Sequence, residues 1–150
     1  MKKVLLLFAL LIFFAFLSFG ANAQIKNNLN FTGDVQIFYA NEIKSAYGSS
    51  IKNGKGTIIF SSIKNLKKII HMYPNFAGFT LILNKYGHSF DCVLNKLNLK
   101  NLFYKQNKSI YGFSLVMPKS IFINNKKINT QITELKSNIY IGCPIILGSY

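Results

Sequence analysis

The chain has 150 residues, and its 18 basic residues, all lysines, outnumber four acids to give a formal charge of +14. This length fits one domain with a sizeable core and is too short for two. Since base readout relies on planar donors such as arginine, which is absent, the composition argues against sequence-specific nucleic-acid recognition. A charge of this size is attracted to anionic surfaces instead.

The first 23 residues have the three parts of a secretory signal peptide. Lys2 and Lys3 form the positive start, an apolar run spans Val4–Leu17, and Ala21–Ala23 supplies a small-residue cleavage site. The apolar run is shorter than the ~20 residues that a membrane-spanning helix needs. We therefore expect cleavage after Ala23 and a secreted, extracytoplasmic domain. An uncleaved N-terminal membrane anchor is the alternative.

The next part of the chain predicts a lead-in and two strands. Residues 24–33 are polar and rich in asparagine, so we expect a flexible lead-in before a single domain over residues 34–150. Val35–Tyr39 and Thr57–Phe60 are rich in β-branched and aromatic residues and predict strands. The glycines between them, within residues 41–56, indicate turns.

A first helix is expected after Ser61 or Ser62, either of which is a suitable cap, and before Pro74. Its apolar side chains recur at helical spacing, and its lysines lie on the other side or at the edge. These lysines are Lys64, Lys67 and Lys68. Two interpretations stay open: the solvated face of a helix packed on the core, and a basic patch that contacts an anionic surface.

Phe76–Asn84 predicts the strongest strand, and Ser89 is expected to cap a second helix that runs to about Leu97. The apolar face of this helix has i, i+3, i+4, i+7 spacing and consists of Phe90, Val93, Leu94 and Leu97. Cys92 points away from that face. A disulfide between Cys92 and Cys143 is favoured by export and disfavoured by this outward position, so both states stay open.

The last third predicts strands. They cover Leu102–Tyr104, Ser109–Val116, a hairpin of Ile121–Ile123 and Lys126–Thr133 around Asn124-Asn125, and Asn138–Gly142. Strands outnumber the two helices. The expected fold is therefore α+β, with both helices on one face of a mostly antiparallel sheet.

Residues 88–92 place a histidine, a serine, an acid and a thiol close together. Nucleophile and base usually converge from different elements, so capping and helix-dipole roles explain Ser89 and Asp91 better than catalysis. No metal-ligand spacing is present, and we expect no metal and no cofactor. A small secreted enzyme that uses Cys92 and His88 is the alternative.

Two C-terminal strings carry a family resemblance. Asn125–Ile132 reads NKKINTQI, and Ile141–Tyr150 reads IGCPIILGSY. Together they resemble the YwmB-like family, secreted proteins of low-GC Gram-positive bacteria. The resemblance runs from Tyr111 to the end of the chain, with Cys143 where threonine is common and Ser149 where an acid is often found. It implies a TATA-box-binding-protein-like fold and no assigned activity.

The expected function is thus that of a non-catalytic binding or structural module, secreted or associated with the cell envelope. Its expected partner is an anionic wall polymer or a membrane surface, which Lys64, Lys67 and Lys68 would contact. Besides the secreted enzyme, a secreted basic effector is a further alternative that export permits.

Overall fold

The computed structural model of the chain describes residues 30–105 and 109–147. The predicted signal peptide, residues 1–23, and residues 24–29 of the predicted lead-in lie outside the described residues.

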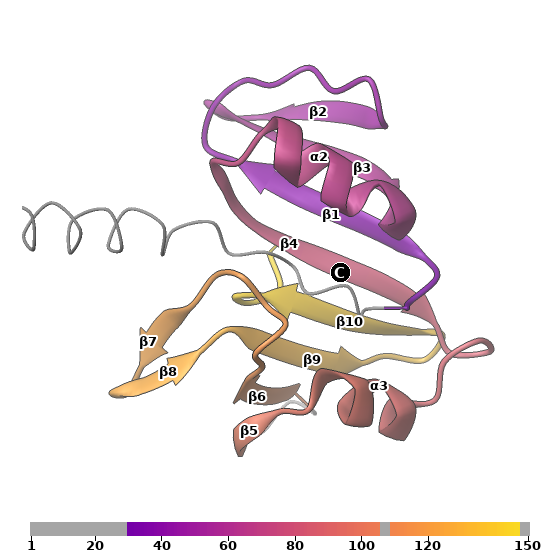
Figure 1. Cartoon of the computed structure of the whole chain (residues 1–150), viewed down its shortest axis with the longest axis vertical. Coiled ribbons are helices and arrows are strands. Elements are labelled where there is room, and N and C mark those ends of the chain that lie inside the picture. The colour runs from indigo at the N-terminus through magenta and orange to yellow at the C-terminus, as the bar shows by residue number, and fades with distance from the viewer. Residues whose placement is uncertain (1–29, 106–108, 148–150) are drawn as a thin grey trace, which may run out of the picture.

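Ten strands account for most of the regular structure in the described part of the chain (Figure 1). Their bounds are β1 (Asp34–Tyr39), β2 (Ser49–Asn53), β3 (Gly56–Ser62), β4 (Phe76–Asn84), β5 (Lys100–Lys105), β6 (Ser109–Phe113), β7 (Ile121–Ile123), β8 (Lys126–Ile128), β9 (Thr130–Glu134) and β10 (Asn138–Cys143). Eight of them form one sheet in the order β2-β3-β1-β4-β10-β9-β6-β5, and each neighbouring pair is antiparallel. Strands β7 and β8 pair with each other as a separate hairpin.

The two predicted helices are confirmed. A 3-10 turn, η1 (Ile63–Asn65), leads into α2 (Leu66–Met72), and α3 spans Phe90–Leu97. Ser89 caps α3 as predicted, because its hydroxyl accepts the backbone N–H of Cys92 at 3.2 Å. Ser62 is the N-cap residue of η1, with an extended backbone, but its side chain makes no cap hydrogen bond. The Ser62 hydroxyl instead donates to the Gly33 carbonyl at 3.5 Å, and the Ser61 hydroxyl donates to the Tyr47 carbonyl.

One face of the sheet and both helices share a single hydrophobic core. Alternate residues of a strand point to the same side, and the register aligns Ile37 with Phe79 and Leu81 with Ile141 across the sheet. These fully buried side chains belong to the same cluster as Leu66 and Ile69 of α2 and Val93 and Leu97 of α3. The architecture is therefore α+β, a mostly antiparallel sheet with two short helices, as the sequence predicts.

The core begins earlier in the chain than the sequence predicts. Phe31 lies in the predicted flexible lead-in, yet its side chain is 5% exposed and belongs to the core cluster. Its ring meets the His88 ring edge to face at a centroid distance of 5.7 Å. The Gly33 carbonyl accepts the Ile63 N–H at 3.0 Å. Residues 30–33 therefore tie the start of β1 to both helices.

Three strand predictions need correction. The sequence predicts no strand within residues 41–56, but β2 lies there and pairs with β3. The turn predicted at Gly54 is present, as the two-residue turn Gly54-Lys55 with Gly54 at φ +61°. The strand predicted over Ser109–Val116 ends at Phe113. The strand predicted over Lys126–Thr133 breaks at Asn129 into β8 and β9.

Asn129 explains both of the last two corrections. Its amide is 2% exposed, accepts the Ser114 N–H at 2.7 Å, and donates to the carbonyls of Ser114 and Met117 at 2.6 and 3.0 Å. The Ser114 hydroxyl in turn donates to the Leu97 carbonyl at the end of α3. Because these bonds hold residues 114–117 in a turn, β6 stops and the β7–β8 hairpin leaves the sheet.

Candidate anionic-surface site

The predicted lysines of the first helix are exposed together on one side of it. Ile63, Leu66 and Ile69 face the core and are buried, whereas Lys64, Lys67 and Lys68 are exposed. Figure 1 shows α2 lying across β1 and β3. Leu66 and Ile69 of α2 are buried, whereas Lys67 and Lys68 of α2 are exposed, and the exposed Lys64 lies in η1 just before α2. We call these three lysines the α2 lysine face. The structure supports the amphipathic pattern that the sequence predicts.

The surroundings of the α2 lysine face contain no compensating acid in sequence. From Ile43 to Phe90 the chain has seven lysines and neither aspartate nor glutamate. The Lys68 ammonium lies 5.8 Å from the centroid of the Tyr47 ring, a cation–π distance. The Asn65 side-chain amide donates to the Tyr47 carbonyl at 3.5 Å, which helps to hold this loop against the helix. The face therefore presents positive charge on a fixed scaffold.

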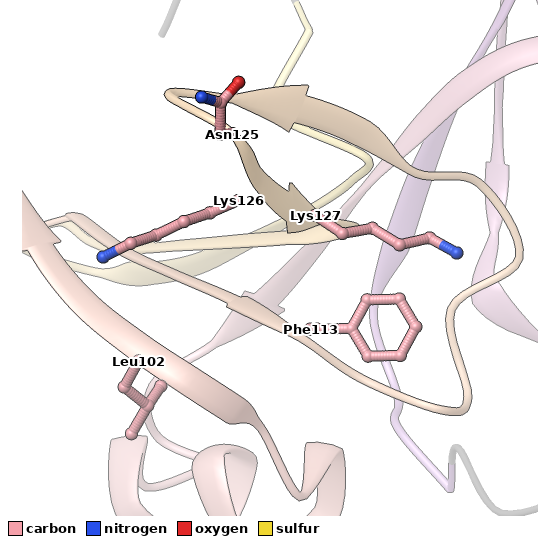
Figure 2. Close-up of a pocket in the computed structure, with 5 residues that line it drawn as sticks. All are labelled: Leu102, Phe113, Asn125, Lys126 and Lys127. Carbon is pink, nitrogen blue, oxygen red and sulfur yellow. The ribbon is translucent and has the colours of Figure 1, made fainter.

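A second basic site lies at the β7–β8 hairpin, and it was not predicted from the sequence. An open hollow of about 630 Å³ lies between the hairpin and the β5–β6 pair. Leu102, Phe113, Asn125, Lys126 and Lys127 line it (Figure 2). The Lys127 ammonium lies 5.4 Å from the centroid of the Phe113 ring. The hollow thus combines two ammonium groups with an aromatic ring and an aliphatic side chain.

The hairpin turn, Asn124-Asn125, is followed directly by two adjacent lysines, Lys126 and Lys127, at the start of β8. Asn124 and Asn125 have φ values of +48° and +60°, which suit a two-residue turn with both residues left-handed. Figure 2 shows the Lys126 and Lys127 side chains leaving the strand in different directions, with Lys127 above Phe113. From Cys92 to Thr133 the chain has seven lysines and no acid, which marks a basic segment but does not locate the hollow.

The sequence left a Cys92–Cys143 disulfide open, and in the structure both cysteines are free thiols. Cys92 is exposed on α3, on the side away from the core, as the helical pattern predicts. Cys143 is fully buried, and its thiol donates to the Lys119 carbonyl at 3.8 Å. Burial raises the pKa of the Cys143 thiol from 9.0 to about 12. One thiol faces solvent and the other is enclosed by the core, so the two do not meet.

In the polar cluster at residues 88–92, His88 and Ser89 make hydrogen bonds that stabilise the fold. The Nε2 atom of His88 lies 3.0 Å from the Thr32 hydroxyl and 3.0 Å from the Thr32 carbonyl. Ser89 is occupied as the cap of α3. The described residues hold no group of three His, Cys, Asp or Glu side chains that would bind a metal ion.

The two C-terminal strings lie on neighbouring strands and are joined by side-chain bonds. The Gln131 side-chain oxygen accepts the Ile146 N–H at 3.0 Å. The Thr80 hydroxyl accepts the Leu147 N–H at 3.2 Å. A Cβ on Gly142 would lie 2.0 Å from the Ile146 nitrogen, so the chain after β10 folds back against β10 itself. These contacts hold the segment after β10 against the sheet.

Within the described residues, no helix has the length and apolar character needed to cross a bilayer. Comparison with protein-family models, with curated proteins and with solved structures gives no match to this chain. The YwmB-like resemblance therefore stays a prediction from the two C-terminal strings.

Proposed function

We propose that the protein is a non-catalytic, extracytoplasmic module that binds an anionic surface of the cell envelope through the α2 lysine face. The observation that carries this proposal is the exposure of Lys64, Lys67 and Lys68 on one side of a helix whose other side is buried. A lysine near an anionic bilayer contributes on the order of 1 kcal/mol. Three such residues on one face together contribute about 3 kcal/mol to association with an anionic surface.

Charge balance over the rest of the molecule favours the same partner. Two of the four acids are paired, Glu42 with Lys52 at 3.7 Å and Glu134 with Lys85 at 2.7 Å. Lys64, Lys67 and Lys68 are exposed, so an anionic wall polymer or an anionic bilayer can reach the α2 lysine face. The N-terminal signal-peptide pattern puts such surfaces within reach.

We also infer that the chain is a YwmB-like protein with a TATA-box-binding-protein-like sheet. Support comes from the contacts of the string residues: Asn129 holds the turn after β6, and Gln131 holds the segment after β10. Because these residues stabilise the fold, short strings that contain them would be shared within a family without indicating a catalysed reaction. The inferred fold name describes architecture and does not bring DNA binding with it.

The test of the binding proposal is co-sedimentation with anionic vesicles and with purified anionic wall polymer over a salt series. Replacing all three lysines of the α2 lysine face by glutamine should weaken binding about a hundredfold at low salt, since each lysine contributes on the order of 1 kcal/mol. Wild-type binding should also weaken as salt rises, because screening shortens the reach of surface charge.

A matched control removes the same charge from scattered positions. Its three substitutions to glutamine fall on exposed lysines that lie on separate elements: Lys55, Lys100 and Lys136. This control should bind several-fold more tightly than the α2 variant. Equal loss in both variants would show that net charge alone drives binding, and absence of binding at low salt would overturn the proposal.

A further inference from the structure

The β7–β8 hairpin exposes a large aromatic side chain. Phe122 is 73% exposed in the middle of β7, directly opposite Lys127 of β8. The hairpin is a two-stranded sheet of its own, and Figure 1 shows it extending away from the eight-stranded sheet. Leu102, which lines the hollow beside the hairpin, is 50% exposed. The hairpin and the β5 residue that lines the hollow beside it thus each expose an apolar side chain, Phe122 and Leu102.

The sequence around Phe122 contains lysines and no acidic residue. The 92–133 segment has seven lysines and no acid, and two of these lysines, Lys126 and Lys127, stand on the hairpin. A surface that binds the hairpin must therefore accept both an aromatic ring and positive charge.

These two requirements distinguish a bilayer from a wall polymer. A hydrophilic polyanion would pair with the lysines but would leave Phe122 and Leu102 in water. An anionic bilayer takes both, since a ring sits at the boundary of headgroups and acyl chains while lysine stems extend to the phosphates. Charge complementarity and exposed apolar area therefore favour a lipid surface as the occupant.

We propose that the β7–β8 hairpin docks on an anionic lipid bilayer and places Phe122 at the headgroup boundary, with Lys126 and Lys127 near the phosphates. This inference rests on the proposed function and narrows its partner from any anionic surface to a membrane. It also assigns the contact to a second element, distinct from the α2 lysine face.

The absence of tryptophan from the chain allows a direct test. Phe122→Trp creates a single tryptophan on the hairpin, and Tyr86→Trp creates one in the turn after β4, where Tyr86 is 97% exposed. With vesicles of phosphatidylcholine and phosphatidylglycerol, the Phe122→Trp emission should shift to the blue and should be quenched by brominated acyl chains. The Tyr86→Trp emission should change in neither way. Both variants carry the same N-terminal residues, so the difference between them reports the hairpin.

A variant with a shortened side chain at Phe122 measures how much the ring contributes to the affinity for vesicles. Phe122→Ala should bind the same vesicles about tenfold more weakly, because it removes a ring whose apolar area the headgroup boundary buries in part. Phe122→Leu should recover most of the affinity. Phe122 is exposed, so circular dichroism should show both variants folded.

The outcomes separate this inference from the proposed function. If the protein sediments with anionic vesicles while the Phe122→Trp emission stays unshifted, the hairpin inference is overturned and the binding proposal stands. Binding to wall polymer but not to vesicles also overturns the hairpin inference and leaves the binding proposal in place. If neither surface is bound at low salt, both proposals fail.

Discussion

At the scale of single residues, the two cysteines place the same group in opposite surroundings. Cys92 is exposed, whereas Cys143 is buried and its pKa is raised to about 12, so it stays protonated at neutral pH. Since the thiolate is the reactive form, we predict that an alkylating reagent at pH 8 modifies one thiol in the native protein and two after unfolding. Mass spectrometry of the labelled protein measures this, and the native label should fall on Cys92.

The control is Cys92→Ala, which should leave the native protein unlabelled. Recovery of a peptide that links the two cysteines from protein kept under oxidising conditions would contradict the assignment of both as free thiols. So would rapid native labelling of Cys143.

The close approach of the Ile145–Ile146 backbone to Gly142 leads to a testable prediction. A Cβ at this position would lie 2.0 Å from the Ile146 nitrogen and 2.1 Å from the Ile145 carbonyl carbon, both backbone atoms. Gly142→Ala must therefore displace the segment after β10, and we expect it to lower the free energy of unfolding by about 1–3 kcal/mol. Chemical denaturation measures the change.

Gly87 provides the matched control for Gly142. It is exposed, and a Cβ there would meet one atom, the Asn84 carbonyl oxygen, at an ordinary distance of 3.9 Å. Gly87→Ala should change the free energy of unfolding by less than about 0.5 kcal/mol. If the two variants unfold at the same denaturant concentration, the close approach at Gly142 is wrong.

At the scale of elements, Asn129 decides where strands end. Its side chain satisfies the buried Ser114 N–H and two buried carbonyls, and it also accepts the Thr130 hydroxyl at 3.0 Å. Asn129→Ala would leave several of these groups without partners, each at a cost of about 1–3 kcal/mol. Because such costs are not additive, we predict a loss of about 3 kcal/mol in the free energy of unfolding.

Asn95, exposed on α3, serves as the comparison. Asn95→Ala should leave stability within about 0.5 kcal/mol of wild type, since alanine also favours the helix. Hydrogen exchange adds a local measurement: in Asn129→Ala, the amide of Ser114 should exchange much faster. Unchanged protection at that amide would contradict the role assigned to Asn129.

The sequence predicted secondary structure best where the hydrophobic residues follow a regular strand or helix spacing. The β4 bounds, Phe76–Asn84, and the Ser89-capped helix were predicted closely, because alternation and helical spacing are local signals. Strand β2 was missed because all five of its residues are exposed, so it has no burial alternation. Its signal was the short Gly54-Lys55 turn.

The remaining features depend on contacts between residues far apart in the sequence, so they were not predicted. Asparagine at position 129 reads as an ordinary strand residue until Ser114 and Met117 come close in space. Phe31 reads as part of a polar lead-in until α3 and His88 provide its partners. Of the two basic sites, the α2 lysine face follows from helical spacing. The hollow at Lys126 and Lys127 requires β5, β6 and the hairpin to be assembled, so it could not be predicted from local pattern.

At the scale of the whole molecule, the formal charge of +14 acts on stability as well as on binding. Most of this charge is carried by exposed lysines on a compact fold, where like charges repel one another more than in an extended chain. The Lys52–Glu42 and Lys85–Glu134 ion pairs oppose this repulsion, and the Lys52–Glu42 pair has both side chains more than 60% exposed. Exposed pairs of this kind contribute about 0–1 kcal/mol, so they offset little of it.

Screening should therefore stabilise the folded protein. The Debye length falls from about 30 Å at 0.01 M salt to about 10 Å at 0.1 M, which removes repulsion between distant lysines before it weakens the short Lys85–Glu134 pair at 2.7 Å. We predict that Tm rises by several degrees as sodium chloride increases over this range, as measured by circular dichroism. A variant with glutamine at Lys64, Lys67 and Lys68 should start from a higher Tm at 0.01 M and should respond less to salt. A wild-type Tm that falls over the same range would mean that ion pairs outweigh repulsion, and the account of an uncompensated positive surface would then be wrong.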